Sequence, residues 1–359
     1  MTVDQQLVSI ALEDSRTLVT NDLALSALAQ ACGVNTESVE LEDNEINLSE
    51  GVEYISPEEY SEILEHRWTN PNDYKVNTFL IYSEHDVGID AFRLKRQGDS
   101  LVPIRVRRDP ISGPHCVTHP RNLEQACLFN LIQDEEVGIV IGTGNYGTGK
   151  SYAFMSYLAN RQAEVIGQYM DKADSGMSWD AYPEKVFGKN PPRIVVIPNN
   201  AQAADTRELA ALPGGVLDKE LVYLGSLNDF LGETTVREWY ELGWIEIIPM
   251  SVLRGRNIEN AIIYVQEAKN LSREQVKLIV GRVGAGSRVF FDGDIKQTDR
   301  KVFQNNNGLV LLNKMRDEGE PLIGTVRLQT IERSAIAQLA ERLDELEMKI
   351  EDGAGKRLK

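Results

Sequence analysis

The sequence predicts an α/β fold in which helices cover both faces of a parallel sheet, preceded by a small β-rich module. Two observations carry this prediction. From Asn122 onward, short apolar segments alternate with segments of helical periodicity, which is typical of a parallel sheet. The first apolar segment is followed by a glycine-rich loop and then by a helical segment. Strand, loop and helix in this order form the phosphate-binding unit of many α/β proteins.

The strands of the predicted sheet are short apolar runs, as expected for strands that are buried on both faces. We place them at residues 137–141, 194–197, 245–248, 262–265 and 289–291. The helix after the fourth strand is the best defined, because Ser272 and Gln275 can form a capping box. Leu271 and Val276 can pack together where this helix begins, and Gly281 is expected to end it.

The chain before the predicted sheet divides into two parts. Residues 1–40 contain one βα unit, with a strand at 16–20 and a helix that ends near Gly33. Residues 41–120 are expected to form the β-rich module and a linker. The remainder, residues 121–359, is the predicted α/β domain.

Local patterns define the ends of these parts. Strands are expected at 77–82 and 102–106, and prolines between 110 and 120 predict an irregular linker. Near the C-terminus, residues 332–351 carry an apolar stripe at helical spacing. This helix is expected to dock on the core or on a neighbouring subunit.

Residues 144–151 match the phosphate-binding pattern G-x-x-x-x-G-K-[ST] at every fixed position. Such a match arises by chance in about one chain in a hundred of this length. Glycines let backbone N–H groups point at phosphate oxygens, Lys150 can reach the β- and γ-phosphates, and the Ser151 hydroxyl can bind Mg²⁺. The expected phosphate-binding residues are Gly144, Asn145, Tyr146, Gly147, Thr148, Gly149, Lys150 and Ser151. The alternative, a glycine-rich hairpin with an incidental lysine, does not account for the flanking strand and helix.

Composition excludes several classes of protein. The net charge of −17 disfavours a nonspecific polyanion binder, so any nucleic-acid site must be local. No apolar run approaches the roughly 18 residues of a membrane span, and the N-terminus lacks the pattern of a signal peptide. The three cysteines are scattered, which fits a reducing compartment. We therefore expect a cytoplasmic protein without a membrane partner.

Several segments between residues 120 and 345 resemble, in order, the PhoH-like family of P-loop ATPases, which are relatives of the RNA and DNA helicases. Besides the phosphate-binding loop, they are residues 121–125 (RNLEQ), 212–214 (LPG), 253–257 (LRGRN), 282–284 (RVG), 293–299 (GDIKQTD) and 332–334 (ERS). The resemblance implies a P-loop NTPase fold of the RecA or helicase type that binds ATP and Mg²⁺ and hydrolyses ATP. It also implies coupling to the remodelling or unwinding of RNA or another single-stranded nucleic acid, and a homo-oligomeric ring with a hexamer as one candidate size.

The same resemblance implies roles for individual residues. Gln125 is similar in placement to the adenine-reading glutamine of helicases. Asp294 and Gln297 resemble a sensor of the γ-phosphate, and the alternative for them is a polar turn after the strand at 289–291. The candidate arginine fingers, which would stabilise charge on the transferring phosphoryl group, are Arg254, Arg256, Arg282 and Arg333.

Two departures from the family pattern bear on function. The family's D-E-A-Q-N after an apolar strand is Q-E-A-K-N here, so Gln266 stands where an aspartate would hold Mg²⁺ or its water shell. Losing one charge-assisted bond costs about 1.5–3 kcal/mol, which weakens Mg-nucleotide binding or slows turnover. Glu267 is retained and is expected to position or deprotonate the attacking water. Second, residues 198–200 (PNN) replace the family's Arg-Pro, which puts coupling to nucleic acid in doubt.

Residues 18–22 (LVTND) resemble the last acidic motif of a PIN ribonuclease domain, which comes first in the PIN-fused branch of the family. Only the last βα unit of such a domain has a counterpart here. A metal-dependent nuclease needs three or four converging carboxylates, and the upstream acids have no counterpart. We interpret Asp22 as a helix cap and expect no autonomous nuclease.

Two hypotheses for function follow. The leading one is a PhoH-like ATPase that hydrolyses ATP with Mg²⁺ and remodels or unwinds RNA. The alternative is a nucleotide-binding regulatory or scaffold protein with weak or no hydrolysis, because Gln266 replaces the aspartate.

Overall fold

The structure is a computed structural model in which the described residues fall into two compact units, Met1–Asn47 and Leu48–Lys359. The described residues are 3–13, 16–20, 23–37, 50–85, 87–145, 147–173, 187–198, 222–293 and 307–332. Several predicted features lie outside them. These are Asn21, Asp22, Tyr146, residues 199–200 and 212–214, Asp294, Gln297, Arg333 and all but the first residue of the expected C-terminal helix.

The first unit contains the expected strand and helix together with elements that were not predicted. Its elements are α1 (Val3–Glu13), β1 (Leu18–Val19), α2 (Leu23–Ala31) and β2 (Thr36–Glu37). β1 and β2 pair in parallel, and Val8, Ala11, Ala29 and Val34 form a small core. In helix α1, Val8 and Ala11 are buried, whereas Leu7, Ile10 and Leu12 are exposed. Apolar residues therefore lie on more than one side of this helix, which obscures the periodic pattern of a surface helix.

The second unit is built on a six-stranded sheet in the order β11-β10-β12-β13-β9-β14, with every pair parallel. The strands are β9 (Ile139–Gly144), β10 (Arg193–Ile197), β11 (Ile245–Ile247), β12 (Ala261–Val265), β13 (Arg288–Asp292) and β14 (Ile323–Leu328). The predicted α/β fold is confirmed. Strand β14 was not predicted, because Gly324, Thr325 and Arg327 interrupt its apolar pattern.

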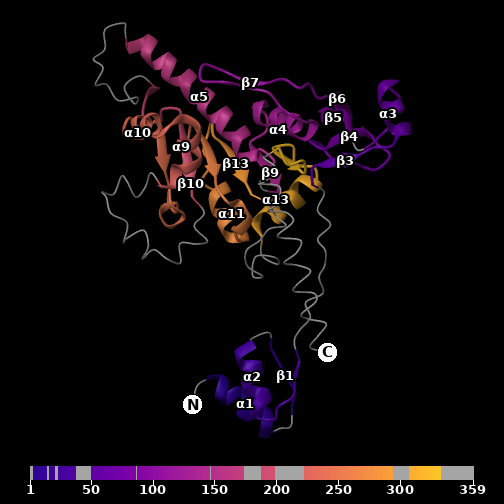
Figure 1. Ribbon diagram of the computed structural model, residues 1–359, viewed down its shortest axis with the longest axis vertical. Coiled ribbons are helices and arrows are strands. Elements are labelled where there is room, and N and C mark those ends of the chain that lie inside the picture. Colours follow the sequence, from indigo (N-terminus) through magenta and orange to yellow (C-terminus); the bar gives the residue numbers. More distant parts are fainter. Residues whose placement is uncertain are drawn as a thin grey trace. The chain divides into compact units, whose positions relative to one another are not determined.

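Helices cover both faces of this sheet (Figure 1). They are α4 (Leu123–Gln133), α5 (Lys150–Ala173), α9 (Gly225–Leu231), α10 (Glu233–Glu241), α11 (Arg273–Val280) and α13 (Gly308–Asp317). Alternate residues of one strand face different helices: Phe290 packs in the core formed with α4, α5 and α9, whereas Phe291 packs in the core formed with α11 and α13. Two-sided burial explains why the strands are nearly continuous apolar runs.

The capping box predicted for α11 is present. The Ser272 hydroxyl accepts a hydrogen bond from the Gln275 backbone N–H at 3.2 Å, and the Gln275 side chain accepts one from the Ser272 N–H at 2.8 Å. Leu271 and Val276 are buried in the same core, and Gly281 caps the end of the helix. The sequence determines this helix locally, because all the partners lie within about one turn of its ends.

The β-rich module is a four-stranded sheet in the order β3-β4-β5-β6. Its elements are β3 (Val52–Tyr54), α3 (Pro57–Leu64), β4 (Phe79–Glu84), β5 (Val87–Gln97) and β6 (Ser100–Arg105). The two expected strands correspond to β4 and β6. The longest strand, β5, was missed because Asp90, Arg93 and Lys95 interrupt its apolar residues.

Arg93 joins this small sheet to the larger one. Its side chain is only 3% exposed and donates to the Asp134 carboxylate at 2.7 Å, to Asn130 at 3.0 Å and to Asn77 at 2.7 Å. Lys95 also donates to Asp134, at 2.8 Å. Asp134 caps α4, so these bonds attach the module to the helix that leads to the candidate site.

The Asp134 carboxylate leads to a prediction about pH. Burial alone would raise its pKa, but the hydrogen bond from Lys95 and the charge of Arg93 outweigh burial and lower the pKa. Its stabilising effect is therefore complete above the unfolded pKa of about 4 and is lost as the pH falls through the lower folded value. We expect Asp134→Asn to be less stable than wild type at neutral pH and the difference to shrink in acid, as measured by urea unfolding between about pH 7 and pH 3. A difference that does not vary with pH would contradict this assignment.

The linker expected between residues 110 and 120 is more ordered than predicted. It contains the short antiparallel pair β7 (Ile111–Ser112) and β8 (Val117–Thr118). The side-chain oxygen of Asn160, on α5, accepts hydrogen bonds from the backbone N–H groups of His115 and Cys116 at 3.0 and 2.9 Å. A residue about 45 positions away thus holds this segment, which sequence pattern could not indicate.

Candidate nucleotide-binding site

The phosphate-binding loop connects the end of β9 to the start of α5, as the sequence predicted. Gly144, Gly147 and Gly149 have φ values of 123°, 83° and 91°, which favour glycine. Because the loop leads into the N-terminus of α5, backbone N–H groups and the positive end of the helix dipole are available to an anion there.

Gly144 is also required for close packing. A Cβ atom added at Gly144 would lie 1.9 Å from the carbonyl oxygen of Leu328, on the adjacent strand β14. We expect Gly144→Ala to lower the free energy of unfolding by about 2–4 kcal/mol, because left-handed strain and a backbone clash add together. Gly98→Ala is the matched control, since Gly98 also has a positive φ, of 61°, but no atom within 4 Å of its added Cβ. Equal losses in the two variants, measured by denaturant unfolding, would rule out the clash with β14.

Lys150 lies across the loop. It is 9% exposed, and its Nζ donates to the carbonyl oxygens of Gly144 and Asn145 at 2.6 and 2.8 Å. The Thr148 hydroxyl donates to the same Asn145 carbonyl at 3.0 Å. The ammonium group is therefore held at the mouth of the loop, where it can reach a phosphate by turning away from these carbonyls.

Gln125 contacts the loop from α4. Its side-chain nitrogen donates to the Thr148 carbonyl at 2.9 Å, and its side-chain oxygen accepts from the Arg121 backbone N–H at 2.8 Å. Asn122 caps the same helix by accepting from the Gln125 N–H at 2.9 Å. In this arrangement Gln125 braces the phosphate-binding loop; the adenine-reading role implied by the resemblance stays a prediction.

The segment after β14 closes one side of the site. The Glu332 backbone N–H donates to the Gly147 carbonyl at 3.1 Å, and the Glu332 side chain accepts from Asn122 at 2.8 Å. Earlier in this segment, the Gln329 N–H donates to the Glu124 carboxylate at 2.6 Å. This segment therefore contacts the loop, 185 positions earlier in the sequence, and the start of α4, more than two hundred positions earlier.

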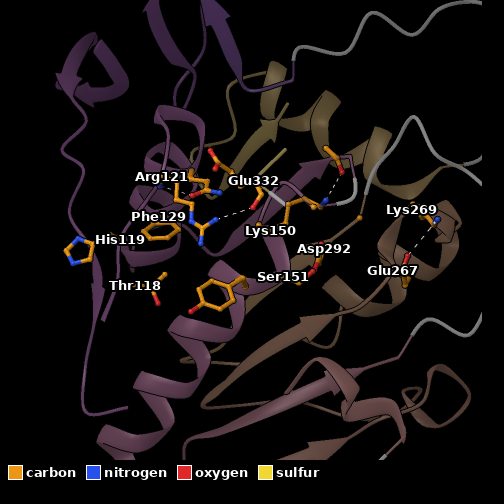
Figure 2. Close-up of a pocket in the computed structure, with 16 residues that line it drawn as sticks. Thr118, His119, Arg121, Phe129, Lys150, Ser151, Glu267, Lys269, Asp292 and Glu332 are labelled. Atoms are coloured by element: carbon orange, nitrogen blue, oxygen red, sulfur yellow. Dashed lines mark hydrogen bonds and ion pairs between the residues drawn. The ribbon is translucent and has the colours of Figure 1, made fainter. Parts of the chain in front are cut away.

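The carboxyl ends of β12 and β13 bring further charged groups to the site (Figure 2). Glu267 follows β12 in a left-handed conformation, with φ of 47°, and its carboxylate lies 3.9 Å from the ammonium of Lys269. Glu267 is 58% exposed in its side chain, whereas Lys269 is 6% exposed. A non-glycine residue with positive φ at a strand end is common at functional sites.

Asp292 ends β13 and is 7% exposed. The Tyr264 hydroxyl, from β12, donates to its carboxylate at 2.7 Å. Burial, followed by the charge of Asp292, raises the pKa of Tyr264 well above its ordinary value, whereas a hydrogen bond with the Ser151 hydroxyl lowers it. Tyr264 therefore stays protonated and remains a hydrogen-bond donor to the carboxylate of Asp292.

These groups surround one cavity of about 350 Å³. Away from Glu267 and Lys269, Figure 2 shows Thr118, His119 and Phe129. Arg121 and Tyr152 also line the cavity. Aromatic rings and a guanidinium group suit the flat face of a nucleotide base. The cavity therefore offers a polar end for phosphates and an aromatic end for a base.

Some predicted site residues lie elsewhere. Gln266 is not among the described residues that line the cavity. Its backbone N–H donates to the carbonyl oxygen of Ile197, in the sheet, at 3.2 Å. Arg254, Arg256 and Arg282 do not line it either, and Arg256 pairs with Glu246. Their proposed roles stay predictions.

Sequence analysis missed several cavity residues. They are Thr118, His119, Arg121, Phe129, Tyr152, Lys269, Asp292 and Glu332. A signal existed for Asp292, because it directly follows an apolar strand, and the carboxyl ends of parallel strands are where ligands bind in open α/β sheets. Arg121, Lys269 and Glu332 lie in segments that resemble the family pattern, but no role was assigned to them. Thr118, His119, Phe129 and Tyr152 are identified only by tertiary proximity.

Comparison with known proteins agrees with this geometry. Residues 184–343 match the model of a family described as PhoH-like protein. The chain is thus similar to PhoH-like proteins over these residues. The similarity agrees with the parallel sheet flanked by helices that the second unit forms.

The PhoH-like relatives differ in how much of each chain aligns. Protein PhoH2 of Thermobispora bispora is 28% identical over 228 residues, which cover 62% of this chain and 46% of that protein. Protein PhoH2 of Mycolicibacterium smegmatis is 30% identical over 232 residues, which cover 63% and 47%. Protein PhoH2 of Bacillus subtilis is 27% identical over 345 residues, which cover 91% and 72%. The chain thus spans about half the length of the first two relatives.

None of the helices within the described ranges is both long and apolar enough to cross a membrane. The resemblance of residues 18–22 to a PIN domain stays a prediction.

Proposed function

We propose that this protein binds ATP together with Mg²⁺ in the cavity at the phosphate-binding loop and hydrolyses the γ-phosphate. The observation that carries the proposal is the convergence of Lys150, Ser151 and Glu267 on one cavity, with the helix dipole of α5 behind them. Lysine, hydroxyl and carboxylate are the groups that phosphoryl transfer to water requires.

The residues divide the chemistry among them. Lys150 binds the β- and γ-phosphates, and the Ser151 hydroxyl is placed to hold Mg²⁺. Mg²⁺, held there, would offset the negative charge that develops on the phosphate oxygens. Glu267 orients a water and accepts its proton as the water oxygen bonds to the γ-phosphorus. The bond from that phosphorus to the bridging oxygen breaks, which releases phosphate and ADP.

We further propose that hydrolysis is coupled to remodelling or unwinding of RNA or another single-stranded nucleic acid in the cytoplasm. This part rests on the resemblance to helicase relatives. Coupling is tested by phosphate release from wild type, Gln266→Asp and Lys150→Ala, each with and without single-stranded RNA. Turnover in wild type that exceeds Lys150→Ala supports the ATPase, and stimulation by RNA supports the coupling. If neither RNA nor DNA changes the rate of phosphate release, the proposed motor function is ruled out and the ATPase activity remains.

The alternative is a nucleotide-binding regulatory or scaffold protein. The observation in its favour is the pairing of Glu267 with Lys269, since a carboxylate engaged by a buried ammonium is a weaker base. Under this alternative, wild type binds ATP as tightly as Gln266→Asp but releases phosphate no faster than Lys150→Ala.

The exposed Arg254 supports a proposal about assembly. Because Arg254 does not line the cavity of its own chain, it can act as a finger only in the site of a neighbouring subunit. We propose a homo-oligomeric ring. Mass measurement with and without nucleotide tests the ring. Adding Lys150→Ala subunits to Arg254→Ala subunits should then restore turnover, because mixed rings contain an intact Lys150 site next to an intact Arg254.

A further inference from the structure

The buried acidic residue that lines the cavity with Ser151 ends β13, not β12. The family pattern places an aspartate directly after the strand that is β12 here, but this chain has Gln266 there. The adjacent strand, β13, ends instead in Asp292. Val265 of β12 lies opposite Phe291 of β13, so Gln266 and Asp292 occupy equivalent positions at the same edge of the sheet.

Asp292 is closer in the sheet to the phosphate-binding loop than Gln266 is. It pairs with Gly142 of β9, two residues before the loop begins. It lines the cavity, is 7% exposed, and lies beside Ser151 (Figure 2). Gln266, which follows a strand separated from β9 by β13, is not among the described residues that line the cavity.

Asp292 and Ser151 line the same cavity. The Tyr264 hydroxyl donates to the Asp292 carboxylate at 2.7 Å and holds it in place there. Mg²⁺ usually keeps several of its waters in protein sites, and carboxylates are among its usual partners. A carboxylate in the same cavity as the Ser151 hydroxyl is therefore placed to accept hydrogen bonds from those waters.

The other acidic side chains that line the cavity, within the described residues, are engaged differently. Glu267 lies near Lys269 and is largely exposed, and Glu332 accepts a hydrogen bond from Asn122 at 2.8 Å. Of these three acidic residues, all within the described part of the chain, only Asp292 is buried.

We propose that Asp292 replaces the missing aspartate after β12 and holds the water shell of Mg²⁺ opposite Ser151. The inference rests on the proposed function, because it assigns the metal partner of that same site. The carboxylate has moved by one strand along the sheet edge, so the site keeps its negative charge although position 266 is neutral.

The test is the coupling between Mg²⁺ and nucleotide, measured without turnover. The affinity of the full chain for a fluorescent ADP is determined in EDTA and in Mg²⁺. The dissociation constant in EDTA divided by the dissociation constant in Mg²⁺ reports the coupling. We expect Asp292→Asn to lower this ratio about tenfold to a hundredfold, as for loss of one charge-assisted bond. Affinity in EDTA should be unchanged or higher, because a repulsive charge near the phosphates is removed. The affinity of Asp292→Asn for Mn²⁺ in the presence of ADP, measured by electron paramagnetic resonance, should fall in parallel.

Two further variants separate a metal role from a structural one. Tyr264→Phe removes the hydrogen bond and keeps the charge, so it should retain most of the coupling. Asp292→Asn combined with Gln266→Asp should recover part of it. If Asp292→Asn fails to fold, Asp292→Leu combined with Tyr264→Phe replaces both partners of the buried hydrogen bond by apolar side chains and leaves neither of them unpaired.

Three results would overturn the assignment: an unchanged ratio in Asp292→Asn, equal losses in EDTA and in Mg²⁺, or wild type that binds nucleotide without any effect of Mg²⁺. Failure of the proposed function looks different, because wild type would then bind no nucleotide or would not exceed Lys150→Ala in phosphate release.

Discussion

Replacing Lys150 by alanine is expected to weaken ATP binding about a hundredfold or more. The ammonium group supplies charge-assisted bonds to two phosphates, each of about 1.5–3 kcal/mol, and no other lysine in the described part of the loop can take its place. Titration of wild type and variant with ATP, by calorimetry or a fluorescent analogue, measures the effect.

A matched control removes the same charge elsewhere. Lys314 is exposed in the last turn of α13 and does not line the cavity, so Lys314→Ala should bind ATP like wild type. Because Lys150 also bonds the carbonyls of Gly144 and Asn145, thermal unfolding of each variant separates loss of binding from loss of the fold. ATP affinity that survives Lys150→Ala in a folded protein would place the nucleotide elsewhere.

Glu267→Gln is expected to lower the rate of ATP hydrolysis by about 10²–10⁴ and to change ATP affinity only a few-fold. General-base catalysis typically contributes that factor, and an amide cannot accept the proton of the attacking water. Single-turnover phosphate release with saturating ATP and Mg²⁺ measures the chemical step directly.

Glu318→Gln provides the comparison for this variant. Glu318 is an exposed carboxylate after α13 and does not line the cavity, so its neutralisation should leave the rate unchanged. Equal rates in wild type and Glu267→Gln would show that another group positions the water. A rate at the background level in both would favour the regulatory alternative, in which Lys269 keeps Glu267 engaged.

The features predicted correctly from sequence are those whose cause is local. The phosphate-binding loop depends on glycines within one turn of chain, and Gly144, Gly147 and Gly149 adopt the positive φ values that it requires. The capping box of α11 involves residues three positions apart. The apolar runs predicted the buried strands because both faces of each strand meet helices.

The features that sequence missed depend on distant partners. Strand β14 is not apolar throughout, and it is a strand because it completes the sheet beside β9. In β5, Arg93 lies in a buried strand because Asp134, Asn130 and Asn77 satisfy its guanidinium group. A local pattern does not record such partners, and without them burying a charged side chain is costly.

For the site, the sequence by itself predicted a phosphate-binding loop at residues 144–151, and it showed the loss of the aspartate at position 266. Only the tertiary structure decided which groups surround that loop. The order β12-β13-β9 places Asp292 between the missing acid and the loop, and the Tyr264 hydroxyl donates to the Asp292 carboxylate. Strand order is set by packing between segments more than a hundred residues apart, and no local pattern of residues records it.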